Sequence, residues 1–265
     1  MCPYGQVLYR PGVRVVAARA AHGRPGRHRP GDGGGGMAAG RTTTDTTTHP
    51  DADCVLCPPL RFRLNAIAGL PGPDAVAAAD DAFLLMPDLA PLTAGHLLLV
   101  SAGHLPCAGA FGPGLWERAL AWRGAVARLY RRAYGDPSLL VLEHGPATPQ
   151  GGGACVDHFH WHLLPGVTGV RALLAQDGLD GVPAGHAVLR ERHRAGRSYL
   201  FVEESGIATV HPGDGVPSQY LRKAAATALR LPGPWRWQET FALPESKARF
   251  HDTMRSAADG LDFAA

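Results

Sequence analysis

Three histidines at alternate positions, His158, His160 and His162, constrain the fold of this chain more than any other feature. Residues i, i+2 and i+4 of a β-strand project from the same face of a sheet. The spacing therefore predicts a strand that carries three imidazoles along one side. The residues between the histidines are aromatic or aliphatic, so the other side is expected to face a core. Such a row indicates a metal site or phosphoryl chemistry; the alternative is three exposed or hydrogen-bonded histidines on a half-buried strand.

The distribution of charge argues against a nucleic-acid partner. The chain has 265 residues, a formal net charge of +3 and a sequence pI of about 8.7. Seven arginines and two aspartates lie in residues 1–50, which leaves 19 basic and 21 acidic residues in the rest. The part that can fold is thus mildly acidic, whereas nucleic-acid binding requires basic residues clustered on a folded face. The length is enough for one large or two small domains, and the 45% of hydrophobic residues is enough for a sizeable core.

The cysteines and the hydropathy of the chain predict a cytoplasmic protein. No stretch approaches the roughly 18 apolar residues of a membrane-spanning helix, and the first residues show no convincing signal peptide. There are five cysteines, an odd number. Without an export signal, their thiols are expected to be reduced and available for a metal. We therefore expect neither a membrane nor a nucleic-acid partner.

Low-complexity sequence gives way to apolar segments near Cys54. Residues 1–50 combine a glycine run with arginine-, proline- and threonine-rich stretches, and they cannot bury enough apolar surface to offset the entropy of ordering. We expect them to form a disordered basic tail. Short apolar runs bounded by turn residues predict strands, and helical periodicity predicts helices. The predicted strands are 83–87, 96–100, 139–143, 155–164, 198–203 and 207–211, and the predicted helices are 115–134, 171–177, 183–192, 218–229 and 244–258.

These elements predict an α+β fold in which helices pack on an antiparallel sheet. The third and fourth predicted strands are expected to form one hairpin with a long glycine-rich loop, and the fifth and sixth another. The predicted division of the chain is a tail over 1–50, a sheet-forming domain over 51–170, and a C-terminal α/β extension over 171–265 that packs on this domain.

Cys54 and Cys57 form a C-x-x-C pair at the start of the folded region. Two thiolates at this spacing fit two corners of a tetrahedral zinc site. The alternatives are a redox dithiol, which lacks the βαβ pattern expected around it, and two unrelated core thiols. The other corners must come from histidine or cysteine elsewhere. His104, at the end of a predicted strand, and His158 are candidates, but the residues alone do not establish that these four meet.

The order of four sequence blocks resembles the histidine-triad (HIT) superfamily of nucleotide hydrolases and transferases. The likeness runs from about Cys54 to Pro165. It rests on the C-x-x-C pair, on the block PDLAPLTAGHLLLV over 87–100, on the histidine that follows at 104, and on the three alternating histidines followed by apolar residues. The zinc pattern looks most like the branch shared with galactose-1-phosphate uridylyltransferase and with dinucleoside polyphosphate hydrolases. For this branch, the resemblance implies a structural zinc held by Cys54, Cys57, His104 and His158.

The resemblance also makes His160 the nucleophile. A neutral imidazole has a free lone pair at pH 7, which can attack the α-phosphorus of a nucleotide. His162 would donate a hydrogen bond that stabilises charge at phosphorus, and His96 would orient or polarise the nucleophile. Asp88 matches the family carboxylate that accepts hydrogen bonds from ribose hydroxyls, although an aspartate in a loop is more often a turn former.

Further candidates for substrate binding lie in two segments. Gly153 and Cys155 belong to the loop before the triad, whose backbone N–H groups could approach a phosphate; a flexible connector is the alternative. The smaller purine-nucleoside phosphoramidase relatives have Gln and Ser where we read Ala154 and Cys155, which implies different phosphate contacts. Gln219 and Arg222 lie in the first turns of a predicted helix, a favourable place for anions, although such residues more often form a solvated helix face.

The sequence thus predicts a nucleotide hydrolase or nucleotidyltransferase that acts at an α-phosphate through a covalent nucleotidyl-histidine. One alternative is a metal-dependent hydrolase in which His158, His160 and His162 bind a catalytic zinc, although positions i and i+4 lie roughly 13 Å apart along a strand. Another is a non-catalytic nucleotide-binding module. The expected partner is a nucleotide or a nucleotide conjugate. Many relatives of this kind are dimers, so a homodimer is an option, although the sequence carries no interface signal.

Overall fold

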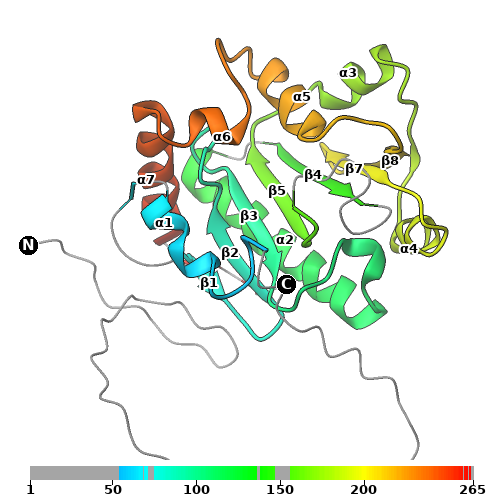
Figure 1. The fold of residues 1–265 in the computed structure, drawn as a ribbon, viewed down its shortest axis with the longest axis horizontal. Coiled ribbons are helices and arrows are strands. Elements are labelled where there is room, and N and C mark those ends of the chain that lie inside the picture. Colours follow the sequence, from blue (N-terminus) through cyan, green and yellow to red (C-terminus); the bar gives the residue numbers. More distant parts are fainter. Residues whose placement is uncertain are drawn as a thin grey trace, which may run out of the picture.

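An antiparallel sheet of eight strands organises the part of the chain that the structure describes (Figure 1). The structure is a computed structural model, and it describes residues 54–67, 69–70, 75–135, 138–146, 156–258, 260–261 and 263. The predicted tail over 1–50 lies outside the described residues. The strand order is β1-β2-β3-β5-β4-β7-β8-β6, and each neighbouring pair is antiparallel. The predicted α+β class is confirmed.

The candidate site is built on four neighbouring strands of the sheet. They are β2 (Phe83–Pro87), β3 (Leu97–Ser101), β4 (Leu139–Gly145) and β5 (His160–Pro165). β5 lies between β3 and β4, and its register places His160 opposite Val100 and His162 opposite Leu98. The antiparallel pairing of β4 with β5 confirms the first predicted hairpin.

β5 begins at His160, later than the predicted start at 155. His158 lies in a bend before the strand, and its ring is turned toward two cysteine thiols. Its backbone carbonyl accepts a hydrogen bond from Nδ1 of the His160 ring at 2.6 Å. The His158 ring faces these thiols, so it does not line up with the rings of His160 and His162 on the strand. The three imidazoles therefore do not form one uniform row.

Helix α2 (Pro113–Tyr134) packs on one face of the sheet. Pro113 takes the first helical position, where a backbone N–H would make no hydrogen bond within the helix, so proline costs nothing there. Gly135 ends the helix in a left-handed conformation with φ of 73°. Each large side chain buried in this layer stabilises the fold by about 1.5–3 kcal/mol. The layer includes Trp122, Val126, Leu129, Val141, Trp161, Leu163 and Phe201.

The opposite face is covered by α3 (Val170–Gln176) and α5 (Tyr220–Ala228), which lie at the top of Figure 1. Helix α7 (Pro244–Ala258) stands at the end of the sheet that β1 and β2 form, and it contacts β2. The layer under α3 and α5 includes Leu140, Leu142, Leu164, Leu174, Leu200, Val202, Leu221 and Ala225. His160 and His162 project from β5 toward this second face, where Tyr220, Leu221 and Arg222 of α5 border the same pocket.

The C-terminal part of the chain continues the same sheet. β7 (Tyr199–Glu204) pairs with β4, and β8 (Ile207–Pro212) pairs with β7, which confirms the second predicted hairpin. Among the described residues, no helix combines the length and the apolar character needed to cross a membrane. The remaining elements are η1 (Arg61–Arg63), α1 (Leu64–Ile67), β1 (Ala78–Ala79), η2 (Ala108–Ala110), β6 (Val182–Pro183), α4 (His186–Arg194) and α6 (Trp237–Thr240).

Glu143 places a carboxyl group in the buried layer between β4 and α2. It accepts hydrogen bonds from the Ala108 N–H at 2.7 Å, from Trp161 Nε1 at 3.3 Å and from the Tyr199 hydroxyl at 3.1 Å. Burial raises the pKa of this carboxyl from its ordinary 4.5 to about 7. Between pH 4.5 and about pH 7, Glu143 is therefore protonated in the folded protein and ionised in the unfolded chain.

The folded protein is therefore expected to lose stability as the pH rises through this window, because a raised carboxyl pKa stabilises the fold only while the group stays protonated. The contribution of this group is on the order of 3 kcal/mol. Glu143→Gln keeps the shape of the side chain and removes its titration, so the variant should be more stable than the wild type at pH 8 and similar to it below pH 5. Urea unfolding at both pH values measures this difference, and an unchanged pH slope in the variant would contradict it.

Candidate functional site

Two cysteines and two histidines from distant parts of the chain meet beside β3 and β5. Nδ1 of His158 lies 3.4 Å from the thiol sulfur of Cys54 and 3.4 Å from that of Cys57. Nδ1 of His104 lies 3.4 Å from the Cys57 sulfur. One ligand atom from each of the four residues lies within 4.8 Å of all the others. The structure thus brings together the four residues that the sequence proposed as zinc ligands.

The donor set of this cluster fits a tetrahedral zinc ion. The turn over 54–57 brings the two thiols to one side, because the Cys57 N–H donates to the Cys54 carbonyl at 3.0 Å. Nε2 of His158 donates to the Ser101 carbonyl at 2.9 Å, which leaves the Nδ1 lone pair directed at the sulfurs. Burial lowers the pKa of His158 to about 4, so this ring is neutral. Burial also raises the pKa of the Cys54 thiol to about 11, so a bound metal has to displace its proton.

The His160 ring is oriented by the backbone of the same segment. Its Nδ1–H donates to the His158 carbonyl at 2.6 Å, so the lone pair of the neutral ring is on Nε2. Burial lowers the pKa of His160, which favours this neutral form. The ring borders the pocket described below, next to that of His162 at 5.2 Å between centroids. A neutral, oriented imidazole with a bare nitrogen is the form in which histidine acts as a nucleophile.

A chain of hydrogen bonds fixes the proton positions on His96 and His162. The Leu92 N–H donates to Nδ1 of His96 at 3.2 Å, so the proton of a neutral His96 must be on Nε2. Nε2 of His96 lies 3.0 Å from Nδ1 of His162 and donates to it, which places the proton of His162 on its own Nε2. Burial lowers the pKa of both rings, that of His96 to about 4, in agreement with two neutral imidazoles. His162 can therefore act as a hydrogen-bond donor at Nε2.

Asp88 is buried beside this pair of histidines and is held by Arg222. Nη1 of Arg222 lies 3.3 Å from each carboxylate oxygen, and the Ala90 N–H donates to Oδ1 at 2.8 Å. Although burial acts to raise the pKa of Asp88, the positive charge of the Arg222 guanidinium brings it well below its usual range. Both oxygens of Asp88 thus already have donors. The contact with ribose hydroxyls that the family resemblance implies for Asp88 stays a prediction.

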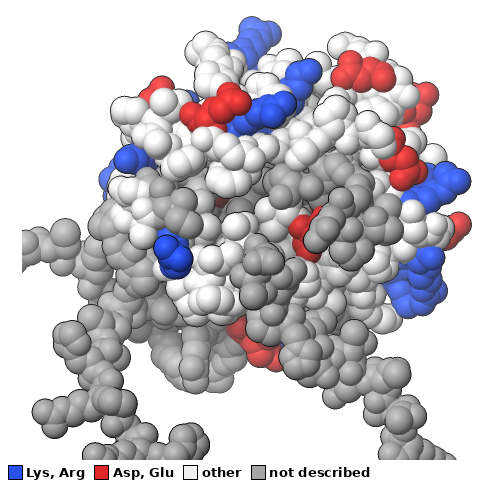
Figure 2. All heavy atoms as spheres, in the orientation of Figure 1, with Lys and Arg blue, Asp and Glu red and all other residues white. Residues whose placement is uncertain are grey.

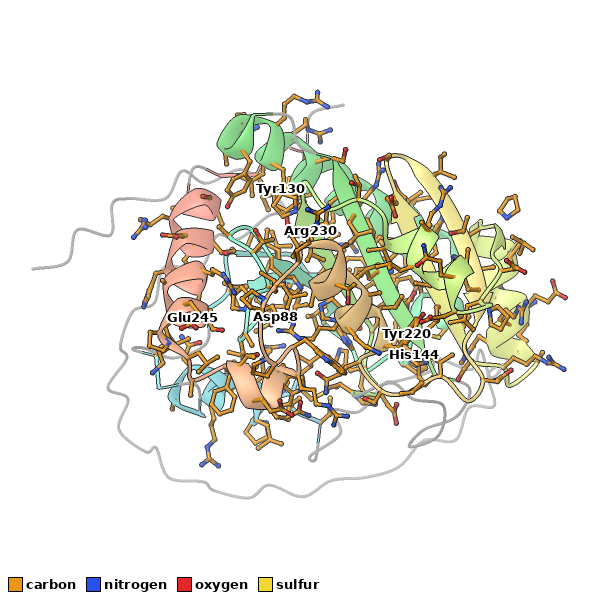
Figure 3. The ribbon with its side chains drawn as sticks, turned by 90° about the horizontal axis from the view of Figure 1, so that it is seen from above. Asp88, Tyr130, His144, Tyr220, Arg230 and Glu245 are labelled. Carbon is orange, nitrogen blue, oxygen red and sulfur yellow. The ribbon has the colours of Figure 1, made fainter. Side chains whose placement is uncertain are left out.

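A pocket opens over the histidines, and its far wall comes from the C-terminal part of the chain. Figure 3 shows Asp88 near the middle of the molecule and His144 close to Tyr220, all of which border this pocket. Gln219 also lines it, but its side-chain amide is engaged, because Nε2 donates to Gln238 at 2.9 Å and Oε1 accepts from the backbone N–H of residue 237 at 3.1 Å. The pocket is lined by Asp88, His144, His160, His162, Gln219, Tyr220, Leu221, Arg222 and Trp237.

Four residues that line this pocket were not among the predicted site residues: His144, Tyr220, Leu221 and Trp237. His144 follows a buried glutamate in β4, Tyr220 and Leu221 begin α5 within the predicted helix 218–229, and Trp237 begins the four-residue α6. No local signal marks them, because their place is set by how the last helices pack on the sheet. Gly153 and Cys155, predicted to contact phosphate, lie outside the described residues.

The geometry does not join the three alternating histidines in one metal site. Among the described residues, two groups of three or more ligand atoms could hold an ion, the Cys2His2 cluster and the group of Asp88, His96 and His162. Neither contains His158, His160 and His162 together. In the second group, the Arg222 guanidinium lies 3.3 Å from the only carboxylate and repels a cation. The Cys2His2 cluster is therefore the better candidate for a metal.

The face of the molecule drawn in Figure 2 carries charges of both signs. Figure 2 shows basic and acidic side chains next to one another around the rim of the face, with mostly uncharged atoms between them. The described residues of this face thus show a mixed charge pattern, whereas nucleic-acid binding uses a continuous basic surface.

A family model described as "Protein similar to CwfJ C-terminal" matches residues 65–166. The matched range holds the loop with Asp88 and His96 and the whole of β5. Cys54 and Cys57 precede it. No curated protein matches the chain.

Solved structures similar to the chain include several HIT proteins. A Hit-like protein involved in cell-cycle regulation from Bartonella henselae is 14% identical, and the match covers 56% of this chain and 97% of that one with a TM-score of 0.33. A member of the HIT family from Bacillus subtilis is 23% identical over 51% of this chain and 84% of its own, with a TM-score of 0.32. A HIT family hydrolase from Clostridium thermocellum is 19% identical over 44% and 92%, with a TM-score of 0.31.

Proposed function

We propose that this chain cleaves or transfers a nucleotidyl group through a covalent intermediate on His160. The observation that carries this proposal is the hydrogen bond from His160 Nδ1 to the His158 carbonyl at 2.6 Å. It leaves Nε2 with a free lone pair in a ring that borders a pocket. Such a ring is prepared for nucleophilic attack without loss of a proton.

In the first step, Nε2 of His160 attacks the α-phosphorus of the substrate. A P–N bond forms, the P–O or P–N bond to the leaving group breaks, and the leaving group departs with the electron pair. The Nε2–H of His162 donates a hydrogen bond to a phosphoryl oxygen and stabilises the charge that develops there. In the second step, water or another acceptor forms the new bond to phosphorus, the P–N bond to His160 breaks, and the proton of the acceptor passes to solvent.

The cluster of two cysteines and two histidines contributes to this reaction by holding His158, which orients the nucleophile. A zinc ion bound by Cys54, Cys57, His104 and His158 would serve as a structural centre, because all four of its corners are taken by protein ligands. His158 links the two parts of the site, since its ring faces the thiols and its carbonyl orients the ring of His160. The backbone at residue 158 is thus fixed on one side and holds the nucleophile on the other.

The direct test is a substrate panel assayed for release of AMP, GMP and UMP. The panel contains dinucleoside polyphosphates, nucleotide sugars and nucleoside phosphoramidates, which share an activated α-phosphorus and differ in the leaving group. We expect the wild type to release a nucleoside monophosphate from at least one of them. Tight nucleotide binding without release from any of them would instead favour a non-catalytic binding module.

A further inference from the structure

Arg222 belongs to α5 but reaches the loop that carries Asp88 and His96. Its side chain is buried, at 4% exposure, and all three of its nitrogens have partners. Nε donates to the Trp235 carbonyl at 2.7 Å, Nη2 donates to the Ala90 carbonyl, and Nη1 faces both oxygens of Asp88. Arg222 is therefore built into the site and does not belong to a solvated helix face.

Helix α7 holds the same loop at two other points. The Gly95 N–H donates to Oγ1 of Thr253 at 2.9 Å, and Nη1 of Arg249 donates to the Pro91 carbonyl at 3.3 Å. These contacts fix the backbone of the loop without touching a side chain of the site. Arg222 differs from these two residues, because its guanidinium contacts the Asp88 carboxylate, which lies next to the histidines.

Asp88 stands beside a proton that the histidine pair shares. Its Oδ2 lies 3.7 Å from Nε2 of His96 and 3.6 Å from Nδ1 of His162, just beyond hydrogen-bonding distance of both. The two ring nitrogens are 3.0 Å apart and hold one proton between them. A small movement of the carboxylate toward the rings would let it accept a hydrogen bond from both.

We infer that Arg222 is a positioning residue: it draws the Asp88 carboxylate away from the imidazoles, so that His96 donates to His162 and His162 keeps its proton on Nε2. Without the guanidinium, the Asp88 carboxylate accepts one hydrogen bond from Nε2–H of His96 and another from an Nδ1–H of His162. The proton of His162 then moves from Nε2 to Nδ1, and a bare Nε2 faces the phosphate. The catalytic consequence rests on the proposed function, but the proton position can be observed without any substrate.

Histidine-selective ¹⁵N NMR of the full chain tests this inference. In the wild type, we expect Nε2 of His162 to be protonated and Nδ1 to be bare. Arg222→Gln keeps hydrogen-bond donors but removes the charge, and the two nitrogens should exchange roles. Asp88→Asn combined with Arg222→Gln removes both charges and should restore the wild-type pattern. Arg249→Met, which removes a guanidinium that holds the same loop, should leave the pattern unchanged.

Nucleoside monophosphate release by the same variants gives the second reading. We expect Arg222→Gln to lower the turnover number by about 100-fold, the lower range for loss of one hydrogen bond to the developing charge, with recovery of at least about tenfold in the double variant. An identical protonation pattern in the wild type and Arg222→Gln, or a double variant no better than the single one, would overturn the inference. If the wild type releases no monophosphate, the proposed function fails, and the NMR comparison still decides the role of Arg222.

Discussion

Replacement of His160 by alanine is expected to lower the rate of nucleoside monophosphate release by on the order of 10⁴-fold or more, because the nucleophile of the first step is lost. The fold should change little. The side chain of His160 is half-buried, and the hydrogen bond described for it is made to the neighbouring backbone at residue 158. A single-turnover assay on the best substrate of the panel measures the rate, and thermal unfolding measures the fold.

An exposed histidine on α7 provides the matched control. His251 lies on the surface of this helix, and its ring contacts Phe250. His251→Ala removes the same atoms as His160→Ala, so its rate should equal that of the wild type. A rate in His160→Ala within tenfold of the wild type would show that another group attacks phosphorus.

Replacement of Cys57 by serine is the second change with a large expected effect. The Cys57 sulfur contacts both His104 and His158 at 3.4 Å, so its loss opens the cluster on two sides. We expect the purified variant to lose its zinc, and to lose at least about 3 kcal/mol of unfolding free energy, since structural zinc binding contributes directly to folding. Because His158 also orients the nucleophile, the release rate should fall as well. Metal analysis by mass spectrometry and denaturant unfolding measure the two effects.

Cys107 is the control for this experiment. It is a buried free cysteine, and its sulfur lies 3.6 Å from Nδ1 of His193, away from the cluster. Cys107→Ser should therefore keep one zinc per chain. Zinc retained in Cys57→Ser would point to metal binding by the histidines of the pocket, and a wild type free of zinc would remove the structural centre from the account.

Segments with a strong local pattern could be predicted from the sequence. The helix over 244–258 and the strand over 83–87 have the boundaries that their periodicity and turn residues indicate. Elements of two to four residues, such as β1 and α1, were missed because a repeat of 2 or 3.6 residues cannot be recognised in so short a segment. The start of β5 was misplaced for a different reason, since the alternation of histidines continues through a bend that the chain makes at His158.

For the site as well, residues close together in the sequence could be predicted, whereas contacts between distant residues could not. The spacing of Cys54 and Cys57 indicated a metal pair, but the meeting with His104 and His158 followed only from the family resemblance. The pairing of Asp88 with Arg222 joins residues 134 positions apart. No pattern in the sequence reports it, because the contact arises only when α5 packs beside the loop after β2. The side chains that close the pocket follow from tertiary packing of the C-terminal helices.

The central claim is that a nucleotidyl group becomes attached to Nε2 of His160. Rapid mixing with a substrate labelled at the α-phosphorus, followed by an alkaline detergent quench that preserves P–N bonds, traps the intermediate for peptide mass spectrometry. We expect label on the wild-type peptide that contains His160 and none on His160→Ala. A wild-type protein that releases product without becoming labelled, or equal labelling of the two proteins, would contradict the claim.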